Sequence, residues 1–174
     1  MLKTIRNAWK TEEIRKKIVF TLFILLLYRL GNAVPVPYVD TALLGEYFNS
    51  LSNTVLGLYN VMSGSSFSHA TVFALSIQPY INASIIMQLL TVAIPALERL
   101  QKEGEEGRKK INSITRYGTV VLALIHAVGL YFTLKAYGVV DAPGVMSFLV
   151  IAMTFTAGTA FIMWLGERIT DRGD

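Results

Sequence analysis

The sequence contains no cysteine and few charged residues, and each shortage excludes a class of protein. Without cysteine there is neither a disulfide framework nor a thiolate metal site. Only 16% of the 174 residues are Asp, Glu, Lys or Arg, against about 25% in a typical soluble domain. Apolar residues make up 53% of the chain, and the mean hydropathy is +0.48. This composition predicts a multi-span membrane protein with no room for a sizeable soluble domain.

Side chains that could carry chemistry are also scarce. The sequence contains no HExxH, Walker or Ser/His/Asp pattern, and His126 is the one ionisable residue well inside an expected span. His69 lies far from it in the sequence, so a metal site would need unidentified partners. We interpret His126 as a hydrogen-bonded packing residue between helices, and predict no catalytic, cofactor or metal site. A small four-span membrane enzyme that uses His126, and a structural assembly subunit, are the alternatives.

Four apolar segments have the length of about 20 residues that a helical span requires. The expected spans are 18–36, 71–97, 117–135 and 145–166. Between and around them lie a basic N-terminal segment, a long loop, a hydrophilic loop, a short turn and a tail, at 1–17, 37–70, 98–116, 136–144 and 167–174. Within the second span, the pair Gln78-Pro79 predicts a kink.

Basic residues are distributed unevenly between these connections. Segments 1–17 and 98–116 contain six Lys or Arg each and the tail contains two, whereas 30–75 and 136–145 contain none. The positive-inside rule therefore predicts cytoplasmic termini, a cytoplasmic loop at 98–116, and external connections at 37–70 and 136–144.

The long loop contains a short half-apolar stretch, "NTVLGLYNVM" at 53–62, followed by "SGSS". Ten helical residues extend about 15 Å, against roughly 30 Å of hydrocarbon. We expect a re-entrant element, which is stable at membrane depth only when it is buried in protein or lines a watery cavity.

The helix expected after Gln78 has two unlike faces. At about 100° per residue, Ser84, Gln88 and Thr91 share an arc of about 60°, and Ile81 and Ile85 adjoin it. These polar residues either hydrogen-bond neighbouring helices or line a water-accessible pathway in which the isoleucines form an apolar constriction. The pattern alone leaves both interpretations open.

Four blocks of the sequence resemble the SecY family, the pore subunits of the protein-conducting translocon. They are "YRLGNAVPVPYVD" (28–40), "FALSIQPYINASIIMQLL" (73–90), "KEGEEGRKKINSITRYGT" (102–119) and "MWLGERITDRG" (163–173). The blocks occur in the family's order and spacing. The resemblance implies an all-α membrane protein whose ten spans include the four expected here and a short re-entrant plug helix. It also implies that this sequence is part of a longer chain.

The resemblance further implies roles for individual residues. Ile81 and Ile85 match two members of an apolar pore ring, and Ser84, Gln88 and Thr91 match one wall of a lateral gate. The short helix at about 53–65 matches the plug that seals the channel from outside. Its matching positions are Asn53, Leu56, Tyr59, Asn60, Met62, Ser63, Gly64 and Ser65.

The sequence departs from the family pattern at two places. Tyr38 follows the "PVP" where family members often have glycine, and "SGSS" at 63–66 stands where they often have a double glycine.

The function implied by the resemblance is a channel subunit that is not an enzyme and needs no cofactor. It would pass unfolded secretory polypeptides across the inner (plasma) membrane and apolar segments sideways into the bilayer. The implied partners are the SecE and SecG subunits, the SecA motor and/or the ribosome, signal peptides and nascent polypeptides, membrane lipid, and the rest of the SecY-like chain.

Overall fold

The computed structural model describes residues 2–62, 64–66, 68–141 and 144–173. These residues form eight α-helices and no strand, apart from two isolated bridges. The helices are α1 (Leu2–Lys10), α2 (Glu12–Gly31), α3 (Thr41–Ser50), α4 (Val55–Met62), α5 (Gln78–Ala93), α6 (Pro95–Lys102), α7 (Glu105–Ala136) and α8 (Val145–Gly173). The all-α class predicted from the sequence is confirmed for this part of the chain.

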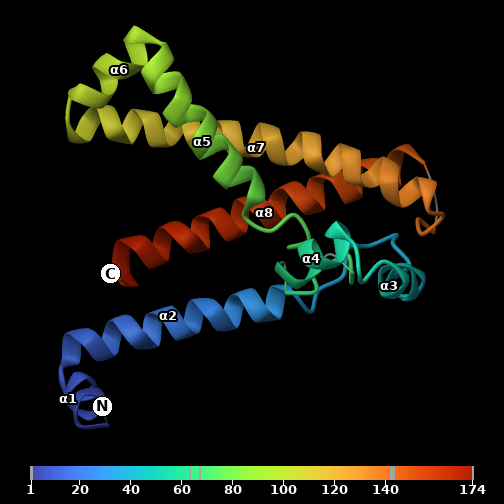
Figure 1. Cartoon of the computed structure of the whole chain (residues 1–174), viewed down its shortest axis with the longest axis horizontal. Helices are drawn as coiled ribbons and strands as arrows, with labels where there is room; N and C mark the ends of the chain where they lie inside the picture. Colours follow the sequence, from blue (N-terminus) through green and yellow to red (C-terminus); the bar gives the residue numbers. More distant parts are fainter. Residues whose placement is uncertain (1, 63, 67, 142–143, 174) are drawn as a thin grey trace.

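The molecule has two distinct ends (Figure 1). Helices α2, α7 and α8 run lengthwise, and α5 crosses them obliquely. At one end, which we call the loop end, lie α3, α4, the last turns of α7 and the first turns of α8. At the other, the basic end, lie α1, α6, the first turns of α7 and the last turns of α8, together with both termini. The three segments predicted to be cytoplasmic thus lie toward the same end.

Two helices in the described ranges are long and apolar enough to cross a membrane, α7 and α8. The pair α5 and α6 adds a third candidate if it is counted as one span broken by a 101° bend. Helix α2 is not in this set because its first turns contain Glu12, Glu13 and several basic residues, which is too many charges for a membrane span. Beyond them α2 exposes Val19, Leu22 and Leu26, and such contiguous apolar surface marks a membrane or protein contact. Its role as the first span therefore stays a prediction.

Several helices extend beyond the predicted apolar segments. Helix α2 covers Glu12–Gly31 instead of 18–36. Helix α7 begins at Glu105, inside the predicted loop, and α8 continues through the predicted tail to Gly173. Glu, Lys and Arg favour helices nearly as well as leucine does. Apolar patterning therefore detects the apolar part of a helix and misses the charged turns that extend it.

The predicted second span is interrupted twice. Residues 71–77 are not helical, so Gln78-Pro79 is the start of α5, where the missing N–H of proline has no intrahelical partner to lose. The helix ends at Ala93 because a residue before proline disfavours the α conformation. Ile94 is accordingly extended, with φ −109° and ψ 112°, and α6 begins at Pro95. The sixteen residues of α5 extend about 24 Å.

The hydrophobic core lies at the loop end, where non-helical segments pack on α7 and α8. The backbone of 34–36 pairs with that of 70–72 through the bonds Val36 N to Ala70 O (2.9 Å) and Val72 N to Val34 O (3.1 Å). Such pairing satisfies polar groups that a membrane would leave without partners. The core residues are Val36, Val39, Leu44, Phe48, Ala70, Ala74, Leu75, Ala127, Tyr131, Leu134, Val139, Val140, Ile151, Ala152 and Phe155.

Two glycines make room for residues 71–77 beside α2 and α8. A Cβ atom added at Gly158 would lie 1.8 Å from the carbonyl oxygen of Val72, and one at Gly31 would lie 1.9 Å from the ring of Phe73. The Phe73 ring stacks on Tyr28 of α2 and on Phe161 of α8, with centroid distances of 5.5 and 6.0 Å. Residues 71–77, which lead into α5, are therefore held between α2 and α8.

Candidate functional site

Helix α5 packs against α7 through one buried face, formed by Pro79, Ala83, Met87 and Thr91. The Thr91 hydroxyl donates to the Met87 carbonyl oxygen at 2.7 Å. Threonine often satisfies its hydroxyl in this way inside apolar helices. Thr91 therefore lies within a helix contact, and its bond is to its own helix instead of a neighbouring one.

The other two predicted gate residues of α5 and the two isoleucines predicted to form the pore ring lie outside that contact. Gln88 is exposed and Ser84 is half-buried at the border of the α7 contact. Ile81 and Ile85 are 42% and 49% exposed. The structure thus divides the predicted arc between a covered position, Thr91, and an uncovered face where Gln88 lies beside the two isoleucines.

The segment predicted as a plug contains α4, which has eight residues and is anchored at its C-terminal side. Helix α4 begins at Val55, so Asn53 precedes it by two positions. The Asn60 side chain accepts a hydrogen bond from Ser68 N at 3.0 Å, and Ser66 Oγ donates to Asn32 Oδ1 at 2.5 Å. These bonds tie the turn after α4 to the end of α2. Of the residues matched to the plug, Ser63 lies outside the described residues.

Tyr59 connects α4 to the segment before α5. Its hydroxyl donates to the carbonyl oxygen of Ala74 over 3.4 Å. Burial of the phenol raises the pKa of Tyr59 above its ordinary value, because the phenolate loses hydration. Tyr59 therefore stays a neutral hydrogen-bond donor at physiological pH.

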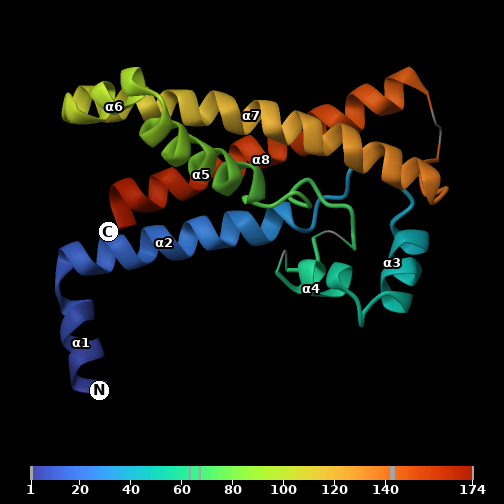
Figure 2. The same ribbon diagram turned by 45° about the horizontal axis from the view of Figure 1, so that its top comes forward.

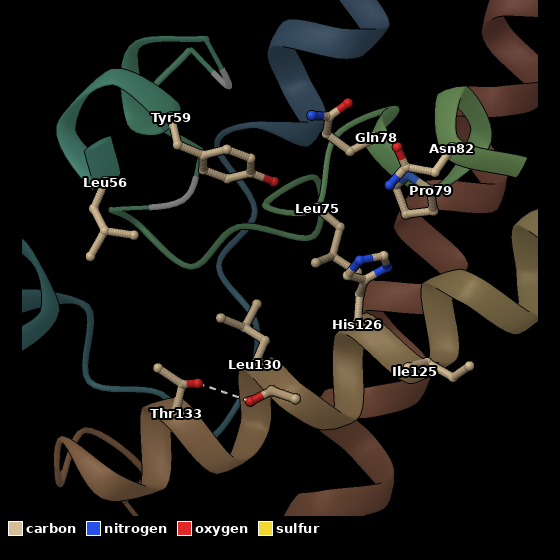
Figure 3. A pocket seen from close by; sticks show the side chains of 11 residues that line it. Leu56, Tyr59, Leu75, Gln78, Pro79, Asn82, Ile125, His126, Leu130 and Thr133 are labelled. Carbon is tan, nitrogen blue, oxygen red and sulfur yellow. Dashed lines mark hydrogen bonds between the residues drawn. The ribbon is translucent and has the colours of Figure 1, made fainter. Parts of the chain in front are cut away.

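A cavity of about 570 Å³ separates α4 from α5 and α7 (Figure 3). We call it the α4 cavity. Leu56 and Tyr59 line it from α4, Gln78 and Asn82 from the first turns of α5, and His126 from α7. The predicted plug and the first turns of the helix that carries the predicted ring therefore line the same cavity.

His126 is hydrogen-bonded, as predicted, but in the described residues it is not packed between helices. Its side chain is exposed and faces the α4 cavity, and Nδ1 lies 2.8 Å from the Leu122 carbonyl oxygen of its own helix. Sequence periodicity could not show this, because the wall opposite His126 is built by α4 and α5. Among the described residues, no group of three His, Cys, Asp or Glu side chains is placed to hold a metal ion.

Both departures from the family pattern fall on left-handed backbone. Tyr38 has φ +65° and Ser65 has φ +66°, and the neighbouring Gly64 has φ +64°. This conformation costs a residue with a Cβ about 1–2 kcal/mol and costs glycine nothing comparable. The backbone therefore explains why glycine suits these two positions.

An ion pair between α7 and α8 was not predicted from the sequence. Arg116 Nε donates to Glu167 Oε1 at 2.7 Å. The sequence places these residues in a loop and a tail that are 51 residues apart, and nothing in their local pattern links them. The only available signal is that each belongs to one of the blocks quoted above.

Comparison with known proteins decides the family. A family model described as SecY matches residues 71–173, which include α5 to α8. The chain belongs to the SecY family. The resemblance inferred from the four sequence blocks is therefore confirmed. The matched region contains the predicted ring and gate residues and begins after α4.

Curated SecY proteins match more of the chain. It is 40% identical to the protein translocase subunit SecY of Aquifex aeolicus (strain VF5) over 180 residues, 99% of this chain and 42% of that protein. The corresponding protein of Streptomyces scabiei is 44% identical over 185 residues, covering 99% and 42%. That of Escherichia coli (strain K12) is 41% identical over 165 residues, covering 92% and 37%. The chain thus spans about two-fifths of the length of these SecY proteins.

Proposed function

We propose that the chain is a channel-forming part of a SecY-type translocon and has no catalytic activity. It helps to pass unfolded secretory polypeptides across the membrane and apolar segments sideways into the bilayer. Membership of a family whose curated relatives are named protein translocase subunits carries this proposal. The geometry of α5 supports it, because a short helix with an uncovered isoleucine pair lies beside the predicted plug.

Ile81 and Ile85 are the proposed ring residues of this chain. They lie one helical turn apart and project from the same side of α5. An isoleucine side chain excludes water and ions and offers a passing polypeptide no hydrogen bond. Gln88 and Ser84 are the proposed gate residues that α7 leaves accessible. Thr91 belongs to the same wall but is buried.

The proposed plug is α4 with the turn that follows it.

The proposed location of the chain is the plasma membrane. The proposed orientation places the basic end in the cytoplasm. The uneven distribution of Lys and Arg supports this orientation. A cysteine introduced at Ser113 should react with an impermeant reagent only from the cytoplasm, and one at Asn49 only from outside. The opposite pattern would reverse the orientation.

The proposed partners follow from the function of such a channel. Other spans of a SecY-like chain, with SecE and SecG, would complete the pore. The driving energy would come from the SecA motor or the ribosome, because the sequence has no nucleotide-binding pattern.

A crosslinking experiment tests the channel function. Single cysteines at Ile81, Ile85 and Ile86 are introduced into the complete translocon, and a secretory polypeptide is stalled during translocation. Crosslinks are expected at Ile81 and Ile85. Ile86 is the control, because it is similarly exposed, at 46%, but lies on another side of α5. Equal crosslinking at all three positions, or none at Ile81 and Ile85, would contradict the assignment.

A further inference from the structure

The first turn of α5 has an empty space on each of two opposite sides. The α4 cavity lies beside Asn82. A second space of about 330 Å³, which we call the polar hollow, lies beside Ile77 and Tyr80 and separates this turn from α7 and α8. Tyr80 and Asn82 are about 200° apart around the helix. The start of α5 therefore has a space on each of two sides, whereas Pro79 in the same turn is fully buried, and farther along the helix Ala83, Met87 and Thr91 are also buried.

The Arg116–Glu167 ion pair forms part of the wall of the polar hollow. It joins α7 to α8, whereas the Glu12–Lys16 and Glu98–Lys102 pairs each connect residues four apart on a single helix. The Glu167 side chain is 24% exposed, and both side chains of the other two pairs are more exposed than this. The Arg116 side chain is 53% exposed, so water still screens the pair, and the partial burial of Glu167 makes it only modestly stronger than a fully solvated pair.

Helix α5 is bounded by a non-helical joint at each end. Before it, Ser76 has φ +52°, and after it the extended Ile94 produces the 101° bend to α6. Joints of this kind absorb backbone rotation while the helix between them moves as one body. The polar hollow is the space on the α8 side into which the first turn of α5 can move.

We propose that Arg116 and Glu167 are positioning residues that set the spacing of α7 and α8 around the polar hollow, and thereby limit the tilt of α5. The consequence for translocation rests on the proposed function, because it assumes that α5 forms a channel wall. With the ion pair intact, the hollow stays narrow and α5 stays against α7. When the pair is broken, α7 and α8 separate, α5 tilts farther, and the channel opens for weaker signal sequences.

The structural part of the proposal is tested by a distance measurement that does not depend on transport. Spin labels are attached to cysteines at Leu89 on α5 and Ala157 on α8 in the complete, reconstituted translocon. This chain contributes no other cysteine. Arg116→Glu and Glu167→Arg should each broaden and shift the distance distribution. The exchanged double variant should restore it, because the opposite charges face each other again.

The functional part is tested on the same variants with weak signal sequences. Each single reversal should raise their export about two- to fivefold, which corresponds to about 0.4–1 kcal/mol at 1.4 kcal/mol per tenfold. The double exchange should return export to the starting level. The matched control reverses the Glu98–Lys102 pair of α6, which lines neither space, and should change neither distance nor export.

The outcomes separate the two claims. Unchanged distances in the single variants, or a double exchange that fails to restore them, would overturn the positioning role. Shifted and restored distances with unchanged export would support the positioning role and contradict the assignment of α5 as a channel wall. If the reversals fail to assemble, Glu167→Gln is compared with Arg116→Lys. Only Glu167→Gln should shift the distance, because Arg116→Lys retains the opposite charge.

Discussion

The loop end and the basic end of the molecule are stabilised in different ways. At the loop end, two non-helical segments pair with each other and pack on α7 and α8, and Ile151 and Phe155 are fully buried. At the basic end α6 packs on α7 and the last turn of α8 lies near α2, whereas α1 turns away from α2 (Figure 2). Helix α5 starts beside the first region and ends in the second. The two ends of α5 therefore lie in regions that are packed differently.

The largest expected effect comes from filling the close contact at the loop end. Gly158→Val should destabilise the protein by about 3 kcal/mol, because its side chain would collide with the backbone of residues 71–77, which cannot rotate away. Thermal unfolding in detergent measures the change.

The matched control for that substitution is Gly129→Ala on α7, where an added Cβ meets nothing within 4 Å. It should be neutral or stabilising by about 0.5–1 kcal/mol, because alanine favours the helix. Equal destabilisation by both changes would show that the loss of stability in Gly158→Val does not come from a collision with residues 71–77.

The next effect concerns the uncovered face of α5. Replacing Ile81 and Ile85 by asparagine in the full-length translocon should raise resting ion leak and the export of weak signal sequences by about tenfold or more. Burying one isoleucine side chain contributes roughly 1.5–3 kcal/mol, and 1.4 kcal/mol corresponds to tenfold. Conductance of reconstituted channels measures the leak. A tight seal with unchanged signal selectivity would remove these residues from the ring.

A smaller effect is expected where α5 meets the basic end. Pro95→Ala removes the restriction on Ile94 and returns a backbone N–H, so α5 should continue toward α6. The distance between spin labels at Leu89 and Lys102 should lengthen, with a stability change below about 1 kcal/mol. Pro37→Ala, in the loop after α2, is the control and should leave this distance unchanged. An unchanged distance in Pro95→Ala would mean that packing of α6 on α7 maintains the bend.

The smallest effect concerns the turn after α4. Ser65→Gly should stabilise the protein by a few tenths to about 1 kcal/mol, because it relieves a left-handed serine but increases the freedom of the unfolded chain. Ser113→Gly, within α7, should instead destabilise by up to about 1 kcal/mol. Thermal unfolding distinguishes the two, and a loss of stability in Ser65→Gly would contradict the argument from backbone conformation.

Much of the architecture could be predicted because it depends on local patterns. Apolar runs located the cores of α2, α7 and α8, and the uneven basic residues indicated that the N-terminal segment, the hydrophilic loop and the tail share one side. The four sequence blocks identified the family. Helix ends were less predictable, since Glu105 and the residues after it continue α7 without an apolar face that would mark them.

The sequence by itself determined the all-α class, the apolar segments, the family, and the arc on which Ser84, Gln88 and Thr91 lie with the isoleucines. Each of these depends on composition or on the fixed geometry of a helix. Only the tertiary structure decided that Thr91 is buried, that His126 faces a cavity, and that Arg116 meets Glu167. These outcomes depend on which helices lie side by side, and local periodicity does not encode the contacts between residues distant in the chain.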